Sequence, residues 1–400
     1  MGLNPLSSIM ALTKTLLLSL LAVLSVNTIA IAPIHAVGVG TTWNHYPPTS
    51  NAQWNAITFG NGLFVAVSSS LGLTPSSIMT SPDGITWTER TPPVTAEWSG
   101  IAFGNNTFVA VASDGNNVMT SVDGISWSAH AHNLNTSWQA ISFGNNIFVA
   151  VGTGNSADRI MTSSNGIIWT GQNDVIGSGA YWSSITYGDL GFVAVGEMFF
   201  VGTSIVIKGS MDGTSWSAAT SPLPTNTRTV AFGDGVFVAT TTVGGAMRST
   251  DQGATWSAVS TPTTNFFLGL TYGAGTFVAV AASGTNRVMT SSDGGITWQS
   301  QNSGTAGDWN AVTYGNGRFV AVANTGSSQV MVSVVPVIDS GPPPPPWLQS
   351  YALSGGETSC MDGWSQSWAQ WPNNNSGGFV CNRSTYWSSG AQAWLEKPGF

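Results

Sequence analysis

Charged residues and cysteines are scarce in this chain of 400 residues. Charged side chains make up 7% of the chain, with 10 lysines and arginines against 18 acidic residues, so the net charge is −8. No run of basic residues is present, which argues against a surface that follows a phosphate backbone, and we expect no nucleic-acid partner. The two cysteines, Cys360 and Cys381, both lie near the C-terminal end of the chain.

Long apolar runs are missing after the first 36 residues. Before that point, Lys14, an apolar stretch over 16–32 and the segment 33–36 have the layout of a signal peptide that is cleaved after Ala36. This layout predicts a secreted or cell-surface protein with no membrane span in the mature chain. The alternative is an uncleaved anchor, because the apolar stretch approaches the roughly 20 residues that cross a bilayer.

Glycine and tryptophan are abundant instead, with 48 and 18 residues, and this composition is typical of short strands and tight turns. A string of the type Phe-Val-Ala-Val recurs at intervals of about 40 to 45 residues, a period that indicates propeller blades. Each repeat contains four short apolar segments separated by Gly-containing turns, which predicts four strands. We therefore expect an all-β fold of seven blades. The strings begin at Phe64, Phe108, Phe148, Phe192, Phe237, Phe277 and Phe319.

The two ends of the repeat region complement each other. A turn tryptophan closes each of the first six repeats, but the seventh ends near Ser333 without one. The unassigned Trp43 lies one repeat before Trp87 and supplies the missing segment. We therefore predict that residues 41–45 pair into the last blade and close the ring, which removes an open sheet edge.

The turn before these tryptophans reads Ser-x-Asp-Gly-x-x-Trp or is one residue longer, except that the third turn has Asn165 in place of the aspartate. It resembles the Asp-box of sialidase-like propellers and of photosystem II assembly-factor propellers, and the resemblance covers about residues 41–335. It implies a structural acidic residue that accepts backbone N–H bonds within the turn. One carboxylate per turn is too few for calcium, so we expect no metal and no cofactor. The structural residues are Asp83, Asp123, Asn165, Asp212, Asp251 and Asp293.

The sequence after the ring indicates a separate small unit. Our boundaries are 1–36 for the signal peptide, 37–338 for the propeller, 339–346 for a proline-rich linker and 347–400 for a tryptophan-rich module. An exported context favours a disulfide between Cys360 and Cys381 in a module this short. Its six tryptophans either form a core or present a binding surface.

Variable loops gather on one face of the expected ring, where a propeller carries its function. The sialidase resemblance implies an arginine cluster of Arg159, Arg228 and Arg287, with Tyr181, Glu197 and Asp114 as the catalytic set. However, the Phe-Arg-Ile-Pro string of that family is absent. We therefore favour a non-catalytic, monomeric protein that binds a glycan or a surface protein, with a sialidase-like hydrolase as the alternative. The candidate ligand-binding residues are Arg159, Arg228, Arg287, Glu197, Asp114 and Asp158.

Aromatic residues open most of the repeats, and their role is left open by the sequence. Five repeats begin with tryptophan, at positions 54, 98, 138, 182 and 309. These rings either pack between blades as core or line the central channel as an aromatic funnel for sugars or apolar groups.

Overall fold

The computed structural model describes residues 40–334, apart from 71–74, 155–157, 178, 199–202, 224–225 and 305–306, and the backbone of 365–370 and 377–382. The described residues form strands joined by turns, with no helix among them. The chain divides into two compact units, Met1–Val335 and Pro336–Phe400. Within the described ranges, no helix is present that is long and apolar enough to span a membrane. The fold of the described residues is all-β.

The strands of the first unit are short and follow one another at regular intervals. The first fourteen are β1 (Trp43–Tyr46), β2 (Gln53–Gly60), β3 (Leu63–Ser69), β4 (Ile78–Ser81), β5 (Thr88–Arg90), β6 (Trp98–Gly104), β7 (Thr107–Ala112), β8 (Asn117–Ser121), β9 (Ser128–Ala131), β10 (Ser137–Gly144), β11 (Ile147–Thr153), β12 (Ile160–Ser163), β13 (Thr170–Gln172) and β14 (Ala180–Gly188). The next fourteen are β15 (Gly191–Met198), β16 (Thr203–Gly209), β17 (Trp216–Ala219), β18 (Thr227–Gly233), β19 (Val236–Thr241), β20 (Ala246–Ser249), β21 (Ser257–Val259), β22 (Phe267–Gly273), β23 (Thr276–Ala281), β24 (Val288–Ser291), β25 (Gln299–Gln301), β26 (Trp309–Gly315), β27 (Arg318–Ala323) and β28 (Val330–Ser333).

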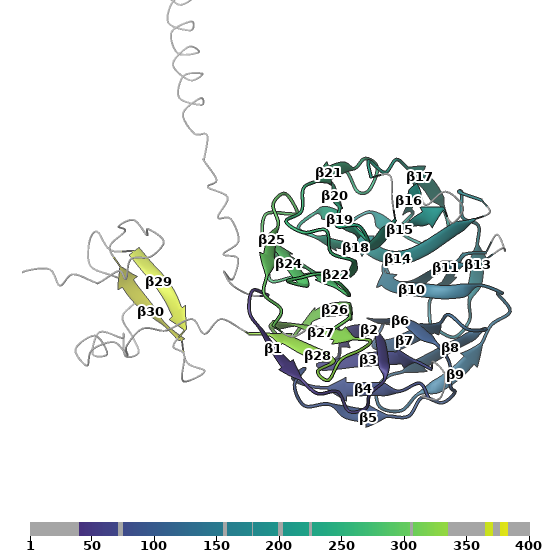
Figure 1. Ribbon diagram of the computed structural model, residues 1–400, viewed down its shortest axis with the longest axis horizontal. Coiled ribbons are helices and arrows are strands. Elements are labelled where there is room, and N and C mark those ends of the chain that lie inside the picture. The colour runs from purple at the N-terminus through teal and green to yellow at the C-terminus, as the bar shows by residue number, and fades with distance from the viewer. Residues whose placement is uncertain are drawn as a thin grey trace, which may run out of the picture. The chain divides into compact units, whose positions relative to one another are not determined.

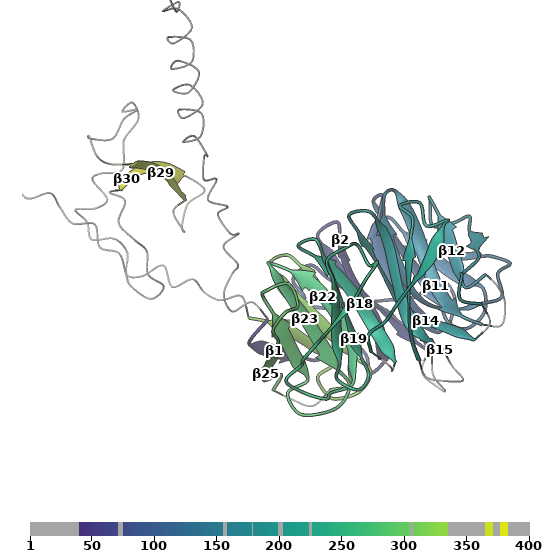
Figure 2. The same ribbon diagram turned by 90° about the horizontal axis from the view of Figure 1, so that it is seen from above.

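These strands form antiparallel sheets that succeed one another around a circle (Figure 1). Four sheets follow chain order, β2 to β5, β6 to β9, β18 to β21 and β22 to β25, and a fifth has the order β1-β28-β27-β26. The eight-stranded sheet consists of β10 to β13 and β14 to β17, joined where Thr153 pairs with Tyr181. We call each set of four strands a group, and the groups begin with β2, β6, β10, β14, β18, β22 and β26. The first strand of each group contacts the first strand of the next, and β26 contacts β2. Figure 2 shows the same sheets from above.

The hydrophobic core lies between successive sheets. In β3, Phe64 and Ala66 pack against β27, whereas Val65 and Val67 pack against β6 and β7. Both faces of this second strand are therefore buried, which explains why its sequence is apolar throughout instead of alternating. The five opening tryptophans are also fully buried, so they pack as core, and Trp182 in addition borders the cavity described below.

Close packing at a glycine joins the last group of strands to the first. A Cβ atom added to Gly315, at the end of β26, would lie 2.1 Å from Cγ of Phe59 in β2. The phenyl ring therefore occupies the space that a larger residue would need. The N-terminal strand completes this region, since Trp43 pairs with Ser333 and Tyr46 with Val330. The pairing predicted from the unassigned Trp43 is present.

The turns that resemble the Asp-box share one pattern of hydrogen bonds. Asp83 Oδ1 accepts the backbone N–H groups of Ile85 and Thr86 at 2.8 Å, and Ser81 Oγ donates to the same oxygen at 2.9 Å. The indole N–H of Trp87 donates to the Gly84 carbonyl at 2.9 Å. The carboxylate thus satisfies donors that the tight turn leaves without a backbone partner.

Acid should weaken the protein through these turns. Backbone hydrogen bonds from Ser126 and Ile125 lower the pKa of Asp123 to about 2. The pKa of Asp251 is also lowered to about 2, mainly by the side-chain hydrogen bond from Thr255. A carboxyl group whose pKa is lower in the folded chain stabilises it above the unfolded value of about 3.9. That stabilisation is lost as the pH falls through about 2, so the free energy of unfolding should decrease between about pH 4 and 2.

An amide at the same position provides the control for this prediction. Asn165 Oδ1 accepts the N–H groups of Ile167 and Ile168 at 2.9 and 3.0 Å, so a neutral acceptor supports the turn. Asp123→Asn should therefore flatten the acid dependence measured by urea denaturation from pH 5 to 2, and Asn165→Asp should steepen it. Equal slopes in all three proteins would contradict this assignment.

The second unit contains one described hairpin, β29 (Ser365–Gln370) paired with β30 (Gly377–Asn382). Trp368 lies opposite Phe379 in its register. Cys381 belongs to β30, but Cys360 lies outside the described residues, as do the predicted signal peptide and the proline-rich linker.

Candidate functional site

The first strand of each group carries a β-bulge directly after its opening residue. In β2 the register steps from Ser68 opposite Trp54 to Val67 opposite Ala56, which leaves Asn55 as an extra residue. The same step occurs in β6, β10, β14, β18, β22 and β26. A bulge redirects the side chain of the extra residue. The extra residues are Asn55, Ser99, Gln139, Ser183, Arg228, Leu268 and Asn310.

Neutral polar side chains at these bulges connect neighbouring groups of strands. The Asn55 amide donates to the Trp98 carbonyl at 2.9 Å, and Ser183 Oγ donates to the Thr227 carbonyl at 3.1 Å. In both cases the acceptor opens the next group along the chain. These bulge residues therefore act within the fold, and sequence reasoning missed the shared position because it held no characteristic residue type.

Arg228 is the one charged residue at this position. Every other arginine of the described part donates a hydrogen bond to another protein group, whereas none is formed by Arg228. Its side chain is exposed at the surface of a cavity. Although Arg228 is exposed to the cavity, the protein around it displaces part of the water near the guanidinium. This desolvation lowers the pKa of Arg228, and the charge of Glu197 acts in the opposite direction. The guanidinium remains charged and is available to a ligand.

The cavity next to Arg228 has a volume of about 370 Å³. Three bulge residues, Gln139, Ser183 and Arg228, contribute to its wall from consecutive groups of strands. The wall combines one positive charge, one negative charge, two amides, four hydroxyl-bearing Ser and Thr residues and aromatic rings, a composition suited to a polar small molecule or a side chain. The lining residues are Gln139, Thr153, Tyr181, Trp182, Ser183, Glu197, Asn226, Thr227, Arg228, Thr242 and Phe266.

Three residues of the predicted catalytic and binding sets meet at this cavity. Tyr181 in β14 and Glu197 in β15 are directly opposite in the register, and Arg228 comes from β18 of the next group. Antiparallel partners present their side chains on one face of a sheet. The local pairing of β14 with β15 therefore places Tyr181 and Glu197 together.

The other two predicted arginines do not line the cavity. Arg159 is 1% exposed, and its Nε lies 2.6 Å from Oδ2 of Asp174. Arg287 Nη1 lies 3.2 Å from Oδ1 of Asp308 and also donates to the Gly307 carbonyl. The arginine cluster that the sialidase resemblance implies is therefore not assembled at this cavity.

The predicted acidic residues outside the cavity are Asp114, whose carboxylate makes a local hydrogen bond, and Asp158, which does so through its backbone. Asp114 Oδ1 accepts the backbone N–H of Glu97, and the Asp158 carbonyl accepts the Thr136 hydroxyl at 2.8 Å. Neither aspartate belongs to the cavity wall. The predicted set thus separates into three residues at the cavity and four elsewhere on the ring.

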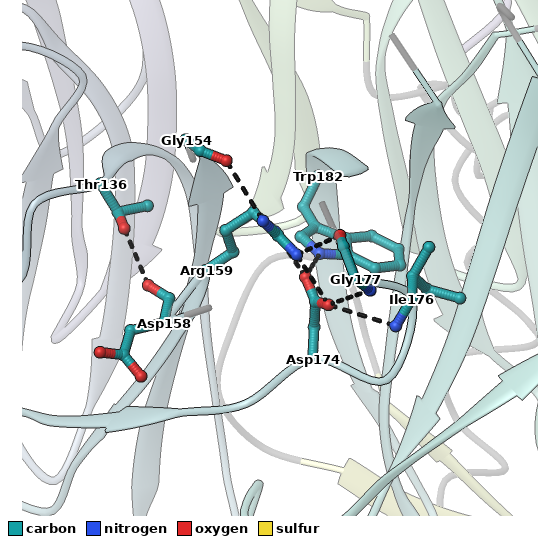
Figure 3. Close-up of polar contacts among 8 residues, drawn as sticks. All are labelled: Thr136, Gly154, Asp158, Arg159, Asp174, Ile176, Gly177 and Trp182. Atoms are coloured by element: carbon teal, nitrogen blue, oxygen red, sulfur yellow. Dashed lines mark hydrogen bonds and ion pairs between the residues drawn. The ribbon is translucent and has the colours of Figure 1, made fainter. Parts of the chain in front are cut away.

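A buried polar network lies beside the cavity wall (Figure 3). Asp174, in the connection from β13 to β14, accepts two hydrogen bonds from Arg159 and one at 3.0 Å from the indole N–H of Trp182. Burial acts to raise the pKa of Asp174, but the bonds from Arg159, Trp182 and Gly177 outweigh it and lower the pKa. Since Trp182 contributes to the wall and follows Tyr181, this network holds one side of the cavity in place.

The same indole N–H has no such acceptor in the other repeats. At Trp54, Trp98, Trp138 and Trp309 the buried nitrogen has no hydrogen-bond partner. The Asp174 network therefore occurs only where β10 to β13 meet β14 to β17 among the described strands, and both of these groups contribute to the cavity wall.

No family model matches the sequence, and no curated protein matches it either. Solved structures match the fold. YCF48 from Cyanidioschyzon merolae is 16% identical, with a TM-score of 0.54, and the match covers 73% of this chain and 98% of that protein. YCF48 bound to D1 peptide is also 16% identical, with a TM-score of 0.57 and coverage of 74% and 97%.

An enzyme shares the fold as well. A catalytically inactive variant of virginiamycin B lyase from Staphylococcus aureus, with Quinupristin, is 12% identical, with a TM-score of 0.61 and coverage of 73% and 99%. Likenesses at this level of identity concern the fold and not the activity. The described residues therefore share the all-β, propeller-like fold of these proteins.

Proposed function

We propose that this chain is an exported, seven-bladed propeller of the Asp-box type that binds a glycan or protein ligand at the cell surface without changing it chemically. The cavity around Arg228 is its binding site, and an anionic group of the ligand pairs with the guanidinium. The C-terminal module, stabilised by a disulfide between Cys360 and Cys381, serves as a tether or a second binding unit.

One observation carries the proposal. Arg228 lies at the wall of a cavity of about 370 Å³, and its guanidinium has no hydrogen bond to any described residue. A charged donor that folding leaves unused, beside amide, hydroxyl and aromatic groups, is well suited to capture an anionic group. Binding of a peptide by one YCF48 structure is consistent with a protein ligand.

The arrangement favours recognition over catalysis. Substrate capture in a sialidase needs several convergent arginines, and at this cavity Arg228 is unaccompanied by Arg159 or Arg287. The lyase neighbour is catalytically inactive as a histidine-to-alanine variant. Among the described histidines of this chain, none lines the cavity.

Arrays of glycans and of peptides, probed with residues 37–400, test this proposal. Arg228→Gln should weaken binding of the retained ligand about ten- to hundredfold, because a hydrogen bond to a charged group contributes about 1.5–3 kcal/mol. Arg90→Gln is the matched control, since Arg90 Nε is already bonded to Thr80 Oγ1 in an outer strand. It should bind as the parent protein does.

Two outcomes would overturn the proposal. Equal binding by the parent protein and Arg228→Gln would remove the cavity as the site. Turnover of a fluorogenic sialoside by the parent protein, abolished in Tyr181→Phe, would replace recognition by hydrolysis.

A further inference from the structure

Two opposite charges face one cavity without forming an ion pair. Glu197 comes from β15 and Arg228 from β18, and both line the wall. Neither side chain forms a hydrogen bond or a salt bridge with a described residue. Their interaction acts through space, since the charge of Glu197 is felt at Arg228. The space between them is therefore open to a ligand.

Three other charged groups among the predicted residues and their neighbours are engaged within the protein. Arg159 pairs with Asp174, and Arg287 pairs with Asp308. Glu97 accepts the Ser113 hydroxyl at 3.1 Å. Glu197 and Arg228 differ from these residues, because their opposite charges face the same cavity and do not form an ion pair.

A ligand with one sign of charge would satisfy half of this site. A carboxylate would be attracted by Arg228 but repelled by Glu197. An ammonium group would be attracted by Glu197 but repelled by Arg228. A ligand that carries both groups would pair with each of them. It would also leave neither charge desolvated and unpaired, which is the costly situation in a site from which a ligand excludes water.

The remaining wall suits a compact molecule with a short polar backbone. Gln139 and Asn226 each offer an amide that both donates and accepts hydrogen bonds. Phe266 is 40% exposed and offers an apolar surface at the same cavity. A volume of about 370 Å³ is at the small end of ligand cavities, which fits a group about the size of a dipeptide.

We infer that the cavity binds a peptide-like zwitterion, with the carboxylate at Arg228 and the ammonium group at Glu197. The inference rests on the proposed function, because it assumes that this cavity is the binding site. It selects peptide chemistry over an acidic sugar, which carries an anionic group without the cation that Glu197 would receive.

A dipeptide library in three chemical forms tests the inference by thermal shift and calorimetry on residues 37–400. The free dipeptides carry both charges, the N-acetylated forms keep the carboxylate, and the C-amidated forms keep the ammonium group. The free form should bind about tenfold or more tightly than either capped form, because each cap removes one charge-assisted hydrogen bond.

Variants assign each charge to its partner. Glu197→Gln should weaken binding of the free dipeptide about tenfold and strengthen binding of the N-acetylated form, since the repulsion is removed. Arg228→Gln should weaken both forms. Glu89→Gln is the control, because the Glu89 carboxylate accepts the Ser77 hydroxyl at 2.6 Å and does not line the cavity.

The outcomes separate this inference from the proposed function. The zwitterion inference is wrong if the N-acetylated form binds as tightly as the free dipeptide. It is also wrong if Glu197→Gln leaves the affinities for both forms unchanged. If, in addition, an acidic glycan binds on the arrays in a manner that depends on Arg228, the proposed function stands and the inference alone fails. If Arg228→Gln alters no binding of any probe, both fail.

Discussion

Deletion of residues 37–47 should lower the melting temperature of the propeller by about 10 °C, because the strand that completes the last sheet is lost. Trp43 is 6% exposed and packs in a cluster with Trp309 and Phe319. Removing a buried tryptophan costs about 3–5 kcal/mol, before the lost backbone pairing with β28 is counted. The exposed edge of β28 should also promote association between molecules.

Addition of the missing segment in trans is the control for this deletion. A synthetic peptide of residues 37–47 should restore much of the melting temperature, whereas the same peptide with Trp43→Ala should not. Differential scanning calorimetry of the truncated protein with each peptide gives the comparison. A melting curve that the deletion leaves unchanged would show that β1 contributes nothing to closure.

Much of the fold could be predicted because each repeat reports the same physical environment. The apolar string that begins at Phe64 is buried on both faces by adjacent sheets, so its composition differs from that of a half-exposed strand. The distance from Trp43 to Trp87 predicted the pairing of β1 with β28, because a closed ring cannot leave one group a strand short.

The cavity was harder to predict because two structural features decide which residues line it. One is the β-bulge at the start of each group, and the other is whether a charged side chain forms an ion pair elsewhere. The bulge position after Trp54, Trp98 and their equivalents has no fixed residue type, so the repeat pattern did not mark it. Arg228 was predicted only as one of three arginines, and the other two lie elsewhere. Arg159 and Arg287 occupy one repeat position, yet their aspartate partners stand at different places in the connections that supply them. Asp174 lies near the start of 173–179, whereas Asp308 is the last residue of 302–308. Such pairing depends on loop conformation, which the repeat pattern does not specify.

This pair of arginines provides an internal comparison for the strength of buried ion pairs. The side chains of Arg159 and Asp174 are 2% and 0% exposed, whereas those of Arg287 and Asp308 are 18% and 44% exposed. Asp174→Asn leaves the buried Arg159 charge without its partner, and breaking such a pair costs about 3–5 kcal/mol. Asp308→Asn breaks an equivalent pair that water screens, with an expected loss below about 1 kcal/mol.

The two variants should therefore differ sharply in thermal unfolding. We expect Asp174→Asn to lower the melting temperature by about 10 °C and Asp308→Asn by about 2 °C or less. The double variant Arg159→Met with Asp174→Leu should recover much of the loss, because it removes both buried charges while keeping similar volume. In Asp174→Asn, the indole fluorescence of Trp182 should also change, since the partner of its N–H is altered. Equal melting temperatures for the two single variants would mean that the Asp174 carboxylate is not desolvated, and the network could not then be what fixes the wall of the cavity.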